Sequence, residues 1–469
     1  MGTSLARWQF ATTSIYHFLF VPVTIGLAFL VAILETAAYR SGDQTYRRLT
    51  RFFGVLLLIN VAVGVVTGLV QEFEFGMNWS VYSAFVGNIF GGPLAMEGLV
   101  AFFLEATFLG AWLFGWDRLP PRVHLACIWA VAAGAMLSAA FIMAANSWMQ
   151  HPVGYVLNHA HQPVLTDVWA LFTNPVFLWS YLHVVLAALV TGSLVMLAFS
   201  AWHLRRQREV DAFRRTATLA LVVLFPSIIL AMVVGSHLGV IETTYQPTKI
   251  AAAEAQWKTC QPCAFSLFQI GGGKDDQAPF EIIQIPHLLS LLATGTWNGK
   301  VEGLNQLNAH YRDVYGPGQY APNVFIQYWA MRVMAYVAGL VLLFSLWGGW
   351  LIQRRRLEQS RWFLRVATWA AITPFAMNTA GWLLTESGRQ PWIVQGLLKT
   401  AAASSPSVTT TDIAISLAVF VLAYIGLGLA DGLLMLRYGR RDLGDEHDTE
   451  GSMGAGESGT APDEPALVY

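Results

Sequence analysis

The chain has 469 residues, of which 55% are hydrophobic and only 12% are charged. Soluble domains carry about 25% charged residues, so this sequence has too few charges to cover a surface that faces water. Its formal charge of −1 excludes nucleic acid as the expected partner, and three cysteines are too few for a disulfide scaffold. The composition therefore predicts an all-α polytopic integral membrane protein.

Nine apolar stretches have roughly the 20 residues that a helix needs to cross a bilayer. In chain order these are residues 15–39, 53–75, 94–116, 124–146, 176–203, 216–239, 327–352, 367–385 and 412–437. Alternate connections hold most of the 28 basic residues, in segments 40–51, 118–122, 205–215, 354–365 and 437–441. Because basic connections stay on the cytoplasmic side, we expect the N-terminus outside and the C-terminus inside.

This pattern divides the chain into four regions. Residues 1–239 are predicted to contain transmembrane helices 1–6, and residues 327–441 to contain helices 7–9. Between them, residues 240–326 are predicted to form a long extracytoplasmic loop, and a loop of that length is usually functional or disordered. Residues 442–469 are acidic and rich in Gly and Ser, which predicts a disordered cytoplasmic tail.

Ionisable residues inside the predicted spans indicate function, because each costs roughly 2.5–3.5 kcal/mol at the centre of a helix. The predicted orientation places several candidate ligands and cations near the outer face, on different helices: His17, His183, Arg332, Met334, Glu386 and Arg389. Haem iron takes His or Met ligands, and haem propionates favour Arg. A lone histidine is more often a hydrogen-bonded core residue, so the shared depth is what favours haem.

Two carboxylates of the third predicted helix could carry protons. Glu97 and Glu105 would lie about 80° apart around a regular helix and about 12 Å apart along it. Asp117 closes this helix at the inner surface, and Ser138 lies partway along the fourth helix. The set could lead protons from the inside toward a site near the outer face. A polar contact between helices is the alternative interpretation.

Cys260 and Cys263 form a lone C-x-x-C pair in the predicted loop. A structural zinc site would need a second pair of ligands with suitable spacing, and the sequence offers none. An extracytoplasmic location permits a disulfide. The sequence leaves the state of the pair open.

Several strings of the sequence carry a family resemblance: WQFATTSIYHFLFVPVTIG, PLAMEGLVAFFLEATFLGAWLFGWDR, NSWMQHPVG, TKIAAAEAQW and GRQPW. They resemble subunit I, the larger and haem-bearing subunit, of the cytochrome bd-type quinol oxidases, in the form with a short quinol loop. The resemblance extends from Arg7 to about Leu436. It implies an electrogenic, non-pumping quinol oxidase that oxidises quinol at the outer face and reduces O2 to water at a di-haem site with cytoplasmic protons.

The resemblance also implies cofactors and partners. The axial ligands of haem b558 would be His183 and Met334. The ligands of haem d and haem b595 would be His17 and Glu386, and which ligand serves which haem stays open. The arginines near haem propionates would be Arg332 and Arg389. The partners would be a homologous subunit II, often a small single-helix subunit, and lipid in a bacterial cell membrane.

Proton and quinol sites follow from the same resemblance. Glu97 matches a glutamate close to the oxygen-reducing haem, and the proton route would contain Glu105, Ser138 and Asp117. The quinol-binding pair would be Lys249 and Glu254, and the quinol could be menaquinol or ubiquinol. Five residues apart on a helix, the two would lie about 140° apart, so they could flank a headgroup without pairing with each other.

One function from another class remains as an alternative. A proton-coupled secondary transporter without haem could also use Glu97 and Glu105. No internal repeat is evident in the sequence, which weakens this interpretation. The two hypotheses differ in a simple observable, because only the oxidase would bind haem.

Overall fold

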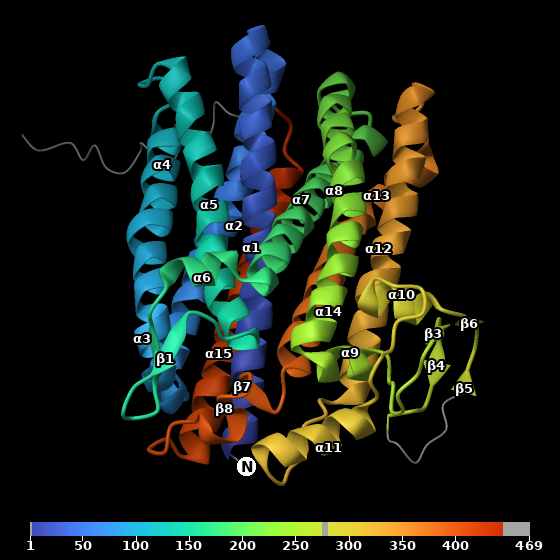
Figure 1. Ribbon diagram of the computed structural model, residues 1–469. Helices are drawn as coiled ribbons and strands as arrows, with labels where there is room; N and C mark the ends of the chain where they lie inside the picture. Colours follow the sequence, from blue (N-terminus) through green and yellow to red (C-terminus); the bar gives the residue numbers. More distant parts are fainter. Residues whose placement is uncertain (1, 274–279, 444–469) are drawn as a thin grey trace, which may run out of the picture.

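Long helices run the length of the molecule, and short elements gather at one end (Figure 1). The computed structural model describes residues 2–273 and 280–443. Within these residues, eight helices are long and apolar enough to cross a membrane. They are α1 (Gly2–Ser41), α2 (Gln44–Met77), α3 (Ser80–Met96) continued by the π-helical η1 (Glu97–Phe102) and α4 (Phe103–Phe114), α5 (Pro121–Gln150), α7 (Pro175–Arg205), α8 (Val210–Tyr245), α12 (Val324–Gln353) and α15 (Thr410–Gly439).

The predicted all-α membrane class is confirmed, but the predicted span at residues 367–385 is not one continuous helix. It is divided between α13 (Arg361–Ala370) and α14 (Thr373–Gly388). Pro374 lies in the first turn of α14. Its ring nitrogen cannot donate a backbone hydrogen bond, so the preceding helix ends before it. The third span also begins earlier than predicted, at Ser80 rather than near residue 94.

Local sequence signals explain where several of the helices begin. The carboxylate of Asp43 caps α2, and Thr409 with Asp412 forms a reciprocal capping box at the start of α15. Pro121 and Pro175 open α5 and α7, at positions where a missing N–H has no cost.

The core forms where α1 crosses α7. A Cβ atom at Gly26 would lie 2.2 Å from the carbonyl oxygen of Ala188, and one at Gly192 would lie 2.4 Å from the carbonyl carbon of Gly26. Only glycine allows the two backbones to approach so closely. Apolar side chains of α1, α2, α5, α7 and α8 pack around this crossing, which places α1 in the middle of the bundle.

The short elements lie at the end where the N-terminus is found (Figure 1). The hairpin β1 (Tyr155–Leu157) and β2 (Pro163–Leu165) and the helix α6 (Val168–Thr173) connect α5 to α7. Between α8 and α12 lie α9 (Pro247–Ala253), α10 (Leu288–Thr294), α11 (Leu304–Tyr315) and the antiparallel pairs β3 (Phe265–Ser266) with β6 (Gln284–Ile285) and β4 (Gln269–Ile270) with β5 (Phe280–Glu281). β7 (Trp392–Val394) and β8 (Leu398–Lys399) follow α14.

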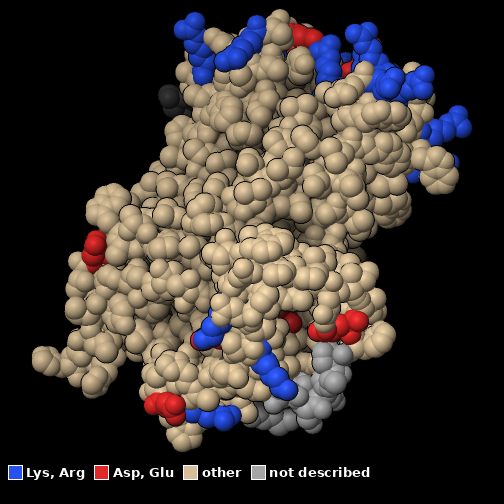
Figure 2. Space-filling view, turned by 45° about the vertical axis from the view of Figure 1, so that its right-hand side comes forward, with Lys and Arg blue, Asp and Glu red and all other residues tan. Residues whose placement is uncertain are grey.

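Lys and Arg side chains gather at the opposite end, above a wide belt in which few charged side chains show (Figure 2). This end holds the arginine-rich connections whose position predicts the cytoplasmic side. The predicted loop at 240–326 is shorter than expected, because α8 extends to Tyr245 and α12 begins at Val324. The predicted tail at 442–469 lies outside the described residues, apart from Asp442 and Leu443.

Candidate functional site

Two histidines inside the bundle are each held through Nδ1. In α1, Nδ1 of His17 lies 2.9 Å from the hydroxyl oxygen of Thr67 on α2. In α7, Nδ1 of His183 lies 3.0 Å from the carbonyl oxygen of Ala231 on α8. A carbonyl oxygen can only accept, so Nδ1 of His183 carries the hydrogen and Nε2 keeps its lone pair. Metal-binding histidines are oriented in this way, with one ring nitrogen fixed and the other bound to the metal.

Glycines make room for both rings. A Cβ atom at Gly68 would lie 3.1 Å from Cε1 of His17, and one at Gly235 would lie 2.9 Å from Cε1 of His183. A larger residue at either position would push the imidazole away from its oxygen partner. Both imidazoles therefore sit in cradles that the neighbouring helix provides.

Helix α14 brings the other candidate ligands toward α1. A Cβ atom at Gly381 would lie 3.3 Å from Sδ of Met334 on α12. The next residue, Trp382, packs its ring edge-on against Phe18 of α1, with the centroids 4.6 Å apart. Glu386 follows one turn later on α14. Consecutive turns of α14 thus contact Met334 of α12, contact Phe18 beside His17 of α1, and carry Glu386.

Two buried arginines, Arg389 beside Glu386 and Arg332 beside Glu254, have unused donors. The carboxylate of Glu386 accepts a hydrogen bond from Nδ2 of Asn146 at 2.8 Å and forms an ion pair with Arg389. Among the described residues, Nε and Nη1 of Arg389 and Nε of Arg332 are buried without a hydrogen-bond partner. Leaving such donors unpaired is costly, so the arrangement favours an additional anionic group, such as a haem propionate.

The donor set as a whole fits haem. It offers two oriented imidazoles, a thioether and a carboxylate as candidate ligands, together with buried guanidinium groups for the propionates. In the described part of the chain, no group of three or more His, Cys, Asp or Glu side chains could hold a metal ion by itself. The combination of His, Met and carboxylate donors with buried guanidinium groups suits iron that is carried by a macrocycle with propionate side chains.

Lys249 and Glu254 have separate partners, although both lie at α9. Nζ of the fully buried Lys249 donates to Oε1 of Glu242 and Oε1 of Gln150, both at 2.8 Å. Glu254 accepts from Nη2 of Arg332 at 2.7 Å. Burial lowers the pKa of Lys249 and raises the pKa of Glu254, and the opposite charge beside each group works against its shift. A solvated loop helix is excluded, because α9 is buried along its length.

Sequence reasoning missed a chain of buried and part-buried hydrogen bonds that joins Lys249 to Glu386. Nε2 of Gln150 donates to Oδ1 of Asn146 at 2.8 Å, and Asn146 donates to Glu386. Together with the bond from Lys249 to Gln150, this connects the predicted quinol pair to a predicted iron ligand. The signal was present in the string NSWMQHPVG, where Asn146 and Gln150 are four residues apart and share a helix face.

The structure joins only part of the predicted proton route. The hydroxyl of Ser138 donates to Oε1 of Glu97 at 2.7 Å. Asp117 has a side chain 75% exposed and pairs with Arg47 at 3.2 Å, so it stays at the surface. The angle of about 80° between Glu97 and Glu105 is wrong, because the backbone is π-helical over Glu97–Phe102 and such a segment turns less per residue.

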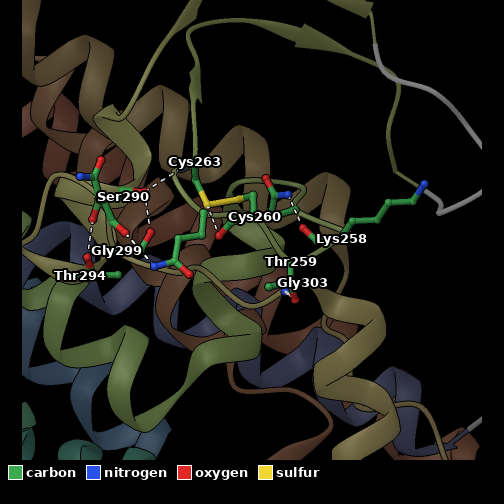
Figure 3. The surroundings of a disulfide bond; sticks show 11 residues. Lys258, Thr259, Cys260, Cys263, Ser290, Thr294, Gly299 and Gly303 are labelled. Atoms are coloured by element: carbon green, nitrogen blue, oxygen red, sulfur yellow. Dashed lines mark hydrogen bonds between the residues drawn. A yellow bond between two sulfur atoms is a disulfide. The ribbon is translucent and has the colours of Figure 1, made fainter.

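The cysteine pair forms a disulfide that helps to fix the segment between α8 and α12 (Figure 3). The N–H of Cys263 donates to Oγ of Ser290 at 2.7 Å, and this hydroxyl donates to the carbonyl of Gly299 at 2.7 Å. Cys263 also packs in one cluster with Ile250 of α9. The disulfide therefore lies in the segment that packs against α9, the helix that carries Lys249.

Comparisons with known proteins cover nearly the whole chain. A family model described as cytochrome bd terminal oxidase subunit I matches residues 5–443. Cytochrome bd ubiquinol oxidase subunit 1 of Bacillus subtilis (strain 168) is 42% identical over 449 residues, which cover 95% of this chain and 94% of that protein. Cytochrome bd-II ubiquinol oxidase subunit 1 of Escherichia coli (strain K12) is 37% identical, with coverage of 93% and 96%. The solved structure of the bd oxidase from Geobacillus thermodenitrificans matches with a TM-score of 0.85 at 29% identity, covering 94% of this chain and 98% of that one.

Proposed function

This chain belongs to the cytochrome bd terminal oxidase subunit I family, and from that premise we propose which of its residues carry each part of the reaction. Its homologues indicate a subunit of a haem-containing quinol oxidase that works in a bacterial membrane as part of a complex. A transporter without haem, the alternative from sequence, is not supported.

Haem b558 would be held by His183 and Met334, and haems d and b595 by His17 and Glu386. When bound, haem supplies the redox-active iron for electron transfer and oxygen reduction. The protein orients the imidazoles through their Nδ1 atoms, and the unused N–H groups of Arg389 and those of Arg332 would bind propionates. The fixed Nδ1 of His183 is the single observation that most supports this function.

Quinol would be oxidised beside α9. A carboxylate can accept the hydroxyl proton of a quinol, and an ammonium can stabilise the oxygen anion that develops. Glu254 and Lys249 supply these two groups from adjacent turns of a buried segment. Either menaquinol or ubiquinol fits this chemistry.

Protons for water formation would enter from the cytoplasmic side through Asp117, Ser138, Glu105 and Glu97. The hydrogen bond between Ser138 and Glu97 supports the part of this route that would lie nearest the oxygen-reducing haem. Quinol protons leave on the outer side, so proton uptake from the inside separates charge without a pumping element.

The complex would contain a homologous subunit II and a small single-helix subunit in the bacterial cell membrane. Two spans of this chain favour such contacts. In Ser80–Phe114 and in Thr410–Tyr438, only 11% of the apolar window is buried within the chain. Surfaces of this kind face lipid or a partner helix.

The haem assignment can be tested with two variants and a matched control in the purified complex. His183→Ala should remove the low-spin haem b band and quinol oxidation, whereas Met334→Leu should leave the haem with an altered reduction potential. His203→Gln is the control, because His203 is buried and bonds the carbonyl of Gly439 at the other end of the bundle. Unchanged reduced-minus-oxidised spectra for both variants would contradict the assignment.

A further inference from the structure

A buried polar cluster lies near the arginine-rich end, apart from the candidate site. Glu35 of α1, Trp112 of α4 and His124 of α5 are 6%, 1% and 5% exposed. Nε1 of Trp112 donates to Oε2 of Glu35 at 2.6 Å, and Nδ1 of His124 lies 2.6 Å from Oε1 of the same carboxyl group. Nε2 of His124 lies 2.9 Å from the carbonyl oxygen of Trp112. One carboxyl group thus connects three helices.

The bonding partners determine how many hydrogens the cluster holds. A carbonyl oxygen only accepts, so Nε2 of His124 carries a hydrogen. The contact between Nδ1 and Glu35 needs a second hydrogen, because two lone pairs would otherwise face each other. This hydrogen lies either on the imidazole, as in an ion pair, or on the carboxyl group, as in a neutral pair. In both states the pair stores one proton more than a neutral histidine beside an ionised carboxylate.

The cluster lies on the inner side of the predicted proton route. Glu105 and Trp112 are seven residues apart in the regular helix α4, so they share a face and lie about 10 Å apart along the axis. Beyond the cluster, the ring of Trp116 packs on His124 with centroids 4.4 Å apart, and the guanidinium of Arg51 lies 4.7 Å from the centroid of Trp116. The cluster is therefore placed between the arginine-rich surface and Glu105.

Charged and titratable groups face the pair from each element that packs around it. They are Tyr39 of α1, Arg47 and Arg51 of α2, Asp117 of the turn after α4, and Arg122 and Cys127 of α5. Asp117 is paired with Arg47, and Arg122 donates to the hydroxyl of Tyr39 at 2.8 Å. Apart from the buried Cys127, these surface groups have contacts of their own, so the carboxyl group of Glu35 is left to bond Trp112 and His124.

We propose that Glu35 and His124 form a proton-holding site at the inner entrance of the route to Glu105. The proposal rests on the proposed role of Glu105 in proton delivery. When Glu105 passes a proton outward, the hydrogen between Glu35 and His124 moves through water toward the vacated carboxylate. A proton from the cytoplasm then restores that hydrogen, while the one on Nε2 stays in place. No electron moves, and the pair returns to its original charge after each proton.

The test measures oxygen consumption of the intact complex with saturating quinol between pH 6 and pH 9. Without a stored proton, uptake depends on free protons, whose concentration falls tenfold per pH unit. The rates of Glu35→Gln and His124→Gln should therefore fall by up to about tenfold per pH unit in the alkaline range, while the wild type changes little. Glu35→Asp keeps a carboxyl group and should retain the wild-type profile. Haem spectra after dithionite reduction should be unchanged in all three.

Thr36→Val is the matched control. Thr36 follows Glu35 and accepts a hydrogen bond from Nε1 of Trp129 on α5 at 3.1 Å, so its loss weakens the same helix contact without removing a titratable group. It should keep the wild-type pH profile. The proposal is refuted if Thr36→Val acquires the alkaline loss, or if Glu35→Gln and His124→Gln keep the wild-type profile, slow equally at every pH or fail to assemble. Absence of haem from the wild-type complex would instead refute the proposed function.

Discussion

Replacing Lys249 should expose the effect of a buried charge, Glu242, that has no second ion-pair partner among the described residues. Lys249 is fully buried, and Glu242, to which it donates at 2.8 Å, is 7% exposed. Lys249→Met fills a similar volume but leaves the carboxylate of Glu242 without its counter-ion. Removing one partner of a buried ion pair costs about 3–5 kcal/mol of the free energy of unfolding. The loss of unfolding free energy caused by Lys249→Met should fall in this range.

A double-mutant cycle separates the lost pair from lost packing. In Lys249→Met with Glu242→Gln both charges of this ion pair are removed and neither is left unpaired, so the double variant should recover roughly 2–3 kcal/mol relative to Lys249→Met alone. The remaining loss is the hydrogen bond from Lys249 to Gln150. Unfolding would be followed by tryptophan fluorescence during titration with SDS in mixed micelles. A cost below about 1 kcal/mol for Lys249→Met, or simple additivity of the two changes, would refute the reasoning.

Three further predictions concern other parts of the chain. Gly192→Ala should cost about 1–3 kcal/mol in the same unfolding assay, because its Cβ atom would overlap the backbone of Gly26. Bonding to Arg215 and to the N–H of Thr45 in the first turn of α2 lowers the pKa of Asp43 from 3.8 to about 2. Its stabilisation is therefore complete above pH 3.8 and lost as the pH falls through about 2, and Asp43→Asn should remove this dependence. Glu105→Gln should slow oxygen consumption by about 10²-fold or more at normal haem content, and near-normal turnover would mean that Glu105 is a packing contact.

Hydropathy alone determined the membrane class and most of the spans, because a bilayer requires long apolar segments whatever their tertiary contacts. The candidate ligands were visible for the same reason. A polar group among apolar residues is costly, so His17, His183 and Glu386 could be identified as candidate ligands from this sequence alone. Their roles came from the family resemblance and not from spacing, since the spacing of residues on different helices carries no information about distance.

Tertiary structure decided what each polar side chain binds. Lys249 bonds Gln150 across 99 residues of sequence, and His124 bonds Glu35 across 89, separations at which no local pattern operates. The π-helical turn at Glu97 and the division before Pro374 also escaped the apolar pattern, which records burial in lipid but not the path of the backbone. A sequence states which groups must find partners in a medium without water, and only the packing of the helices selects the partner.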